Sequence, residues 1–217
     1  MLQGADNNLL KGFYKIATSY IPENSRVLNL GCGLNFNFER ILSQEKKVSI
    51  TSLDILPAKK PPFVDKFIIQ SVEEPFLLKQ KFDVVTFFEL IEHIDKTDIL
   101  IKNCFNNLEN DGLLIFSFPN LSSLYCRLEL LFGFQPHILE ISNKKANFGS
   151  GFFGEKNNRK NQPIHHIRGI TYKAMKEFIQ FYDFRIQKVY GYGWRAKKLF
   201  YFVPSLAPIN IFLAQKP

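Results

Sequence analysis

The stretch Val27–Gly33, Val-Leu-Asn-Leu-Gly-Cys-Gly, constrains the fold of this 217-residue chain more than any other feature. An apolar strand pattern runs directly into a glycine turn, and a second strand pattern ends at Asp54, 21 residues after Gly33. A glycine turn at the carboxyl end of a parallel strand lets a ligand approach the backbone closely. An acidic residue closing the next strand can accept hydrogen bonds from ribose hydroxyls. The spacing therefore predicts an α/β unit that binds a nucleoside.

Strand and helix patterns continue to alternate after this unit. Phe82–Glu89 is typical of a buried strand that leaves an acidic residue at its carboxyl end, and Leu113–Phe118 predicts the following strand. The apolar spacing over residues 101–108 indicates a helix between them, which we expect Asn110–Gly112 to end as a glycine C-cap. Such alternation predicts an α/β fold whose mostly parallel sheet is covered by helices on both faces.

These segments together resemble the successive motifs of the class I S-adenosylmethionine-dependent methyltransferases, over roughly residues 20 to 120. The matching segments are Val27–Gly33, Leu53–Ile55, Phe82–Val85, Glu89–Ile94, Asn110–Gly112 and Pro119–Asn120. Glu89-Leu-Ile-Glu92-His93 is most similar to the ubiquinone-type O-methyltransferases and their small-molecule relatives. The resemblance implies a Rossmann-like, mostly parallel seven-stranded sheet with an antiparallel C-terminal strand. It also implies S-adenosyl-L-methionine as the cofactor.

The resemblance assigns a set of cofactor-binding positions along the carboxyl edge of the sheet. They are Asn29, Gly31, Cys32, Gly33, Asp54, Ile55, Ser71, Val72, Glu73, Phe88 and Glu89. The glycine turn would contact the amino acid part of the cofactor, Asp54 the ribose hydroxyls and Ile55 the adenine. Ser71 stands where the family often has an aspartate, and Glu73 is equally a surface carboxylate. Phe88 is either a cofactor contact or part of an aromatic core strand.

His93, His166 and Arg168 are the candidates for catalysis. Histidine is the side chain most easily poised as a base near neutral pH, and His93 directly follows Glu92. Relatives with the same Glu-x-x-Glu-His pattern suggest acid/base chemistry or a cation site, whereas a histidine at such a turn can equally cap a helix or hydrogen-bond a backbone carbonyl. His165 and His166 are both candidates, and the spacing of the family's His-x-Arg-x-x-Thr segment favours His166. Arg168 is available for an acceptor carboxylate or phosphate, or for holding a loop electrostatically. We assign no metal ion.

The segment 121–165 is long for a connection between a strand and a helix. Leu124–Phe132 has helical character, and Thr171 is expected to cap the next helix. We interpret the segment as a lid-like insertion over the acceptor pocket, within a single methyltransferase domain spanning residues 1–217. The alternatives are a surface insertion or a dimer contact through Leu128, Leu131 and Phe132.

The positive charge of the chain is concentrated near its C-terminus. The net charge is +8, and residues 144–200 hold 13 Lys and Arg against 3 Asp and Glu. Such a region attracts anions, although a solvated lysine-rich surface gives the same composition. The apolar run Leu199–Ala214 contains Pro204 and Pro208 and is shorter than the roughly 20 residues of a membrane-spanning helix. We expect it to form two closing strands, with peripheral membrane contact as the alternative.

Three cysteines, Cys32, Cys104 and Cys126, stand at no metal-ligand spacing and adjoin apolar segments, as expected of reduced core thiols. The N-terminus lacks the apolar region of a signal peptide, so we expect a cytoplasmic protein, either monomer or homodimer.

The leading hypothesis is a small-molecule methyltransferase that modifies an oxygen of a metabolite, sugar or lipid-linked precursor, and an anionic acceptor is among the options. The basic C-terminal third keeps RNA or protein methylation open as an alternative. No Asn/Asp-Pro-Pro-Tyr/Phe segment, Pro-Cys nucleophile or added RNA-binding domain supports a nucleic-acid acceptor. A cofactor-binding scaffold without transfer chemistry is the third possibility.

Overall fold

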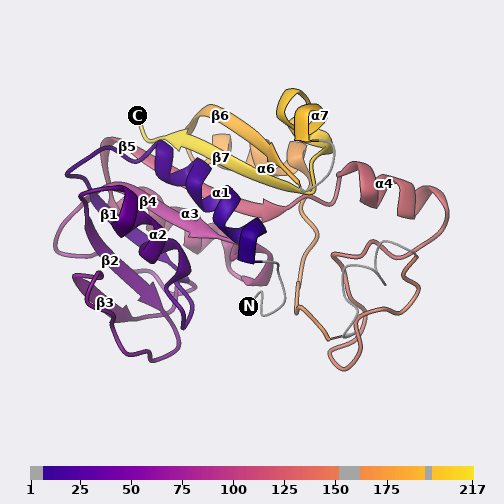
Figure 1. Cartoon of the computed structure of the whole chain (residues 1–217), viewed down its shortest axis with the longest axis horizontal. Helices are drawn as coiled ribbons and strands as arrows, with labels where there is room; N and C mark the ends of the chain where they lie inside the picture. Colours follow the sequence, from indigo (N-terminus) through magenta and orange to yellow (C-terminus); the bar gives the residue numbers. More distant parts are fainter. Residues whose placement is uncertain (1–6, 152–161, 194–196) are drawn as a thin grey trace.

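The computed structural model describes residues 7–151, 162–193 and 197–217 and places all their strands in one seven-stranded sheet (Figure 1). The strand order is β3-β2-β1-β4-β5-β7-β6. The strands are β1 (Arg26–Leu30), β2 (Ser49–Asp54), β3 (Lys66–Ile69), β4 (Phe82–Phe88), β5 (Leu108–Pro119), β6 (Arg185–Tyr192) and β7 (Ile209–Gln215). The pairs among β1 to β5 are parallel, whereas β7 is antiparallel to both β5 and β6. The mostly parallel sheet with an antiparallel C-terminal strand is confirmed.

Helices cover both faces of this sheet, as the alternating pattern predicts. The helical elements are α1 (Asn7–Ser19), α2 (Asn37–Glu45), η1 (Ile91–His93), α3 (Thr97–Asn107), α4 (Leu124–Leu131), α6 (Tyr172–Phe181), α7 (Lys197–Phe202) and η2 (Pro204–Leu206). One buried cluster joins Phe13 of α1 and Leu42 of α2 to the sheet, and the other joins Leu100 of α3 and Met175 of α6 to its opposite face. Figure 1 shows α1 and α2 in front of the sheet and α3 and α6 behind it.

The expected glycine C-cap at Asn110–Gly112 is wrong. Helix α3 already ends at Asn107, whose side-chain Nδ2 donates to the Phe76 carbonyl at 3.2 Å and whose side-chain Oδ1 accepts from the Leu78 amide at 2.8 Å. Residues 109–112 belong to an irregular start of β5, where the register with β4 shifts. The left-handed residue in this stretch is Asp111, with φ 60°.

The apolar tail also differs from the prediction of two closing strands. Its first half forms α7 and η2, and only its second half forms a strand, β7. Pro204 has no amide hydrogen for a sheet ladder and instead begins η2. Helix α7 crosses β6 so closely that a Cβ at Gly191 would lie 2.2 Å from the Phe200 carbonyl oxygen. Within the described residues, none of the helices has the length and apolar character needed to cross a membrane.

Helix α6 begins as predicted. The Thr171 side chain accepts a hydrogen bond from the Ala174 amide at 3.2 Å, which is the geometry of an N-cap. The predicted helical segment after residue 123 is α4, capped in the same way by Ser123, whose hydroxyl accepts from the Cys126 amide. These caps define the starts of two helices: α4, which follows β5 at the beginning of the long insertion, and α6, which follows its end.

Candidate functional site

The connections that leave β1 and β4 run in opposite directions along the sheet, because the strand order reverses between these two strands. In open α/β sheets, ligands bind outside the carboxyl ends of the strands at this point. Leu30, Asp54 and Phe88 end β1, β2 and β4. The residues predicted to bind the cofactor therefore follow three strand ends at one edge of the sheet.

The backbone of the glycine turn has a conformation that favours glycine at both Gly31 and Gly33. Gly31 and Gly33 have φ angles of 68° and 65°, in the left-handed region that other residues rarely adopt. A Cβ at Gly31 would lie 2.8 Å from the Leu90 side chain, whereas a Cβ at Gly33 would meet no atom within 4 Å. The Gly31 and Cys32 amides donate to the Leu53 carbonyl at 2.8 and 3.3 Å. The turn is thus fixed to β2 and leaves open space beside Gly33.

The Asp54 carboxylate closes the other side of this space. Its Oδ2 accepts a hydrogen bond from the Gly33 amide at 2.8 Å, and its Oδ1 accepts one from the Leu56 amide at 3.0 Å. Each carboxylate oxygen has a further lone pair, so both can accept from hydroxyl groups as well. The neighbouring Ile55 side chain is 64% exposed, which leaves an apolar surface next to the carboxylate.

Asn29 lies beneath the turn rather than on its open side. Its amide donates to Glu39 Oε1 at 2.7 Å and its oxygen accepts from the Thr86 hydroxyl at 2.8 Å. Ser52 also donates to Glu39 Oε1, while Glu39 Oε2 has no partner among the described residues. Burial raises the pKa of Glu39, so its carboxyl group favours the protonated form. This network supports the turn, and the sequence analysis did not identify Glu39.

The segment from Ser71 to Glu73 forms a turn against the start of α3. The Ser71 hydroxyl accepts from the Glu73 amide at 3.1 Å, and the Val72 carbonyl accepts from the Asn103 amide at 2.9 Å. Glu73 Oε1 accepts from the backbone amides of residues 95 and 96 at 2.7 and 3.0 Å. The Glu73 carboxylate therefore holds the entry to α3, and only the remaining faces of this turn are available to an adenine.

Phe88 is part of an aromatic cluster between the sheet and the helices in front of it. Its ring lies 4.6 Å from Phe38, 5.2 Å from Tyr14 and 5.9 Å from Phe13 between centroids. Its side chain is 9% exposed, which matches the aromatic core alternative; its backbone still lies at the edge of the sheet. Tyr14 of α1 is a site neighbour that sequence patterns did not reveal. Burial and the charges of two nearby carboxylates, Glu89 first, raise the pKa of its hydroxyl.

Glu89 occupies a strained turn directly after β4. Its φ is 47°, an unusual value for a residue with a side chain, and its Oε1 accepts from the Ser117 hydroxyl at 2.7 Å. Burial raises its pKa to about 7, against the opposing effect of the Ser117 hydrogen bond. The carboxyl group therefore changes charge close to neutral pH.

Glu92, His93 and His166 converge although 73 residues separate the two histidines. Their ligand atoms lie within 4.8 Å of one another, and the two imidazole centroids are 4.8 Å apart. Glu92 Oε1 is 3.9 Å from His93 Nε2 and 3.7 Å from His166 Nε2. The structure thus brings together the two histidines that the sequence analysis selected.

Backbone contacts fix the tautomers of both histidines. His93 Nδ1 lies 3.0 Å from the His165 carbonyl oxygen, and His166 Nδ1 lies 2.8 Å from the Ile138 carbonyl oxygen. Since a carbonyl only accepts, each Nδ1 donates, and each neutral ring presents an Nε2 lone pair toward Glu92. Burial lowers the pKa of His93, and it lowers that of His166 to about 4, so both rings are neutral at pH 7.

Glu92 faces the two Nε2 lone pairs with a carboxyl group that has no partner of its own. Its side chain is 1% exposed, and neither carboxyl oxygen has a hydrogen-bond partner in the described part of the chain. Burial, and next the charge of Glu89, raise its pKa well above the usual range. A buried set of two imidazole lone pairs and a carboxyl group accommodates a proton, a hydroxyl group or a divalent cation.

The Arg168 guanidinium already binds another residue of the protein. Its guanidinium donates to the Asp95 carbonyl at 2.7 Å and lies 3.8 Å from the Asp95 carboxylate. The Ile167 amide beside it donates to the Glu92 carbonyl at 3.0 Å. These contacts favour the loop-holding alternative for Arg168 and tie the end of the insertion to η1.

The insertion leaves and rejoins the sheet at adjacent points. The Leu121 amide donates to the Ile170 carbonyl at 2.8 Å, and Asn120 pairs with Ile170 as an isolated bridge. Figure 1 shows the insertion as a separate lobe beyond the end of β5. Residues 152–161 of the predicted lid lie outside the described residues. The lid function stays a prediction.

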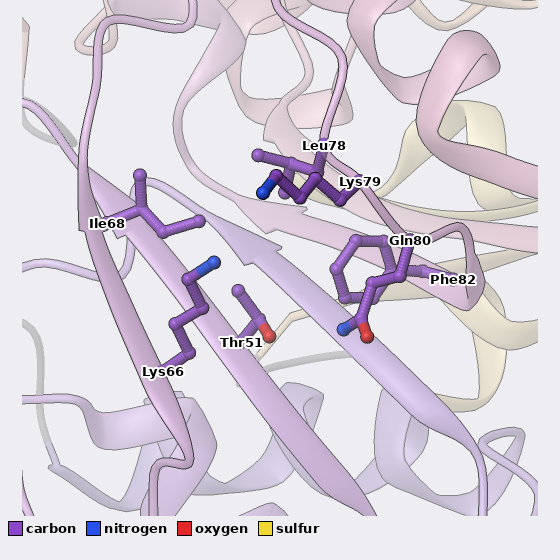
Figure 2. A pocket seen from close by; sticks show the side chains of 7 residues that line it. All are labelled: Thr51, Lys66, Ile68, Leu78, Lys79, Gln80 and Phe82. Atoms are coloured by element: carbon purple, nitrogen blue, oxygen red, sulfur yellow. The ribbon is translucent and has the colours of Figure 1, made fainter.

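A surface cavity lies elsewhere on the sheet. Figure 2 shows it between β2, β3 and the segment that enters β4, with Thr51, Lys66 and Phe82 among its lining residues. Lys66 and Phe82 are the first residues of their strands, so this cavity lies near the amino ends. It belongs to a different edge from the glycine turn and Asp54.

A family model described as a methyltransferase domain matches residues 6–185. The ubiquinone biosynthesis O-methyltransferase of Histophilus somni is 32% identical over 108 residues, which cover 44% of this chain and 45% of that protein. The enzyme of the same name from Pelagibacter ubique is 30% identical over 124 residues, covering 52% and 50%. The chain thus spans about half the length of these curated relatives.

A solved S-adenosylmethionine-dependent methyltransferase from Mesorhizobium loti superposes with a TM-score of 0.63 at 13% identity, covering 97% of this chain and 100% of that one. This likeness supports the fold. The open space at Gly33, the hydroxyl-accepting Asp54 carboxylate and the exposed Ile55 together fit an adenosine-containing cofactor. The chain belongs to the methyltransferase domain family.

Proposed function

We propose that this enzyme methylates an oxygen atom of a small-molecule acceptor, which is a metabolite, sugar or lipid-linked precursor. The observation that carries the proposal is the cluster of Glu92, His93 and His166, in which two Nε2 lone pairs face a buried carboxyl group that has no hydrogen-bond partner in the described part of the chain. An acceptor hydroxyl placed among these groups would donate to one of the Nε2 lone pairs. The resemblance to ubiquinone biosynthesis O-methyltransferases supports oxygen as the methylated atom.

The chain's own residues position the two reactants. The glycine turn would hold the amino acid part of S-adenosyl-L-methionine and Asp54 its ribose, and the sulfonium of the bound cofactor would supply the methyl group and the leaving group. An Nε2 lone pair of His93 or His166 would accept the proton that the acceptor hydroxyl loses on methylation. The remaining imidazole and Glu92 keep the hydroxyl oriented.

The same three ligand atoms can instead hold a divalent cation that binds the acceptor oxygen. Imidazole Nε2 atoms whose Nδ1 groups donate to backbone carbonyls are typical of metal-binding histidines. Assays after chelation and after readdition of Mg²⁺ or Zn²⁺ separate the two modes. Activity that persists in the chelator supports direct proton transfer, and activity restored only by the cation supports ligation.

The acceptor class is tested by measuring transfer of labelled methyl groups to phenols, catechols, hydroxylated sugars and total RNA. His93→Gln and His166→Gln should lower kcat by about 100-fold or more, since general-base catalysis contributes at least that factor, while cofactor affinity stays unchanged. His165→Asn is the matched control: the His165 side chain is exposed and its backbone carbonyl contacts His93. Labelling of RNA alone, or wild-type activity in both variants, would contradict the proposal.

Exposed apolar residues near the insertion support a lipid-linked acceptor or peripheral membrane contact. Leu131 and Phe132 at the end of α4 are 75% and 70% exposed, and Phe202 of α7 is 77% exposed. Tyr125 of α4 and Phe200 of α7 have ring centroids 6.2 Å apart, so the two helices lie together. Co-sedimentation with anionic vesicles, reduced in Leu131→Ser and Phe132→Ser, tests membrane contact; a dimer lost in the same variants would favour self-association.

A further inference from the structure

Helix α4 buries a carboxyl group and exposes leucines. Its buried residues are Cys126 and Glu129, whereas Leu130 and Leu131 are 56% and 75% exposed. A helix at a protein surface usually buries its apolar stripe, and a buried carboxyl group is destabilising unless it has partners. The inverted pattern shows that this face of α4 requires a partner other than a hydrophobic core.

The chain brings a third ligand-forming side chain onto this face. Cys126 and Glu129 are three residues apart and therefore share one side of the helix. The chain reverses at Gly133, which has φ 76°, and His137 then lies against them. His137 Nδ1 is 2.8 Å from Glu129 Oε2, and one ligand atom from each of the three residues lies within 4.8 Å of the others.

The contact with His137 satisfies only one of the two Glu129 carboxyl oxygens. Oε2 also accepts from the His137 backbone amide at 3.0 Å, whereas Oε1 is buried without a hydrogen-bond partner among the residues that the structure describes. The Glu129 side chain is 1% exposed and the His137 side chain 8%, so solvent reaches neither to any extent. An unpaired buried carboxyl oxygen is destabilising and points to a missing ligand.

We propose that Cys126, Glu129 and His137 form a zinc-binding site within the insertion. A thiolate, an imidazole nitrogen and a carboxylate oxygen are the three ligand types that Zn²⁺ takes in proteins, usually in four-coordinate geometry. Zn²⁺ would bind the Cys126 thiolate, the unpaired Glu129 oxygen and a ring nitrogen of His137, with water in the fourth position. The thiol proton and the second imidazole proton of a charged His137 would pass to solvent. The site is separate from Glu92, His93 and His166 and does not depend on the function proposed for them.

Such a site accounts for how the insertion keeps its conformation. Among its described residues from 121 to 170, the buried hydrophobic side chains are Cys126 and Ala146, which is too little for a hydrophobic core. Small units of this kind are commonly stabilised by a structural metal ion. His137 precedes Ile138, whose carbonyl accepts from His166 Nδ1, so the ion would also fix the backbone that orients His166.

Cobalt spectroscopy of the full-length protein tests the site directly. Metal-free, reduced protein is titrated with Co²⁺ and then Zn²⁺, and a thiolate-to-cobalt charge-transfer band should reach its maximum at about one equivalent. Cys126→Ser should abolish the band, and Glu129→Gln or His137→Gln should weaken Zn²⁺ binding by about 100-fold or more. Cys104→Ser removes a buried thiol from α3 instead and should leave the band unchanged, as should His93→Gln.

Circular dichroism of every variant distinguishes loss of a ligand from loss of the fold. A folded wild-type protein without the charge-transfer band, or an undiminished band in Cys126→Ser, would overturn the proposal. S-adenosyl-L-methionine binding is measured on the same samples, so a failed zinc site and a failed methyltransferase assignment give different results. Zn²⁺ should also slow limited proteolysis between residues 132 and 165 in wild type and leave the rate unchanged in Cys126→Ser.

Discussion

At the scale of single residues, Glu39 connects the buried interior to the glycine turn. Its Oε1 accepts from Asn29 and Ser52, and the residue is fully buried. Glu39→Ala should lower the free energy of unfolding by about 2 to 3 kcal/mol, because it removes two hydrogen bonds and leaves the buried Asn29 amide unpaired. Urea unfolding measures the loss.

The matched control for this variant is Glu45→Ala in the same helix. Glu45 forms a surface pair with Lys15 at 3.6 Å, so its loss should change the free energy of unfolding by less than about 0.5 kcal/mol. Equal losses in the two variants would show that the buried network does not support the turn.

Single residues at strand ends could be predicted from the sequence, whereas those that meet only in three dimensions could not. Asp54 and the two glycines follow from local spacing, because a strand end fixes where its next residue points. Glu39, Tyr14 and the contact of Cys126 with His137 depend on helix placement. Sequence spacing could not place Cys126 near His137, because it does not show that the chain reverses at Gly133.

At the scale of elements, Arg26 connects three strands at the amino edge of the sheet. Its guanidinium lies 2.7 Å from Asp83 Oδ1 of β4 and 3.0 Å from Glu109 Oε1 of β5. The Arg26 hydrogen bonds lower the pKa of Asp83, although the carboxylate is 38% exposed and solvent screens the pair. The contribution to stability is therefore modest, at most about 1 kcal/mol.

Asp83→Asn should reveal this contribution through its pH dependence. The depressed pKa of Asp83 means that the stabilisation is complete above the unfolded-state value of about 4 and disappears as the pH falls through the lower folded-state value. Urea unfolding at pH 7 should show Asp83→Asn less stable than wild type, and the difference should shrink toward pH 3. A difference that grows as the pH falls would contradict the ion pair.

The core elements of the sheet could be predicted because their patterns are local. β1, β4 and the second half of β5 are mostly apolar runs, and Thr171 is a recognisable cap. The tail could not be predicted, because Leu199–Ala214 is mostly apolar and periodicity does not distinguish a short buried helix from a strand. Its first half becomes α7 because it packs over Gly191, a contact that no local pattern records.

At the scale of the whole molecule, the insertion is a segment that leaves the sheet and returns to it, and its two ends are hydrogen-bonded to each other. Replacing residues 124–168 with a short Gly-Ser linker should leave the sheet folded, since Leu121 and Ile170 already lie side by side. Cofactor affinity should stay within about threefold of wild type, because the variant keeps the rigid strand ends that carry the turn and Asp54. Methyl transfer should be lost together with His166. A variant that transfers methyl groups normally would show that the insertion is not part of the acceptor site.

The most direct test of the account is calorimetric titration of wild-type protein, Asp54→Ala and Asp65→Ala with S-adenosyl-L-methionine. Asp65 is a matched control, because its carboxylate also accepts a backbone amide, that of Ile50 at 2.8 Å, near the amino end of β2. We expect saturable wild-type binding, weakened by about tenfold or more in Asp54→Ala, about 1.4 kcal/mol, and unchanged in Asp65→Ala. Absence of binding by folded wild-type protein, or equal binding by all three, would contradict the assignment of the cofactor site.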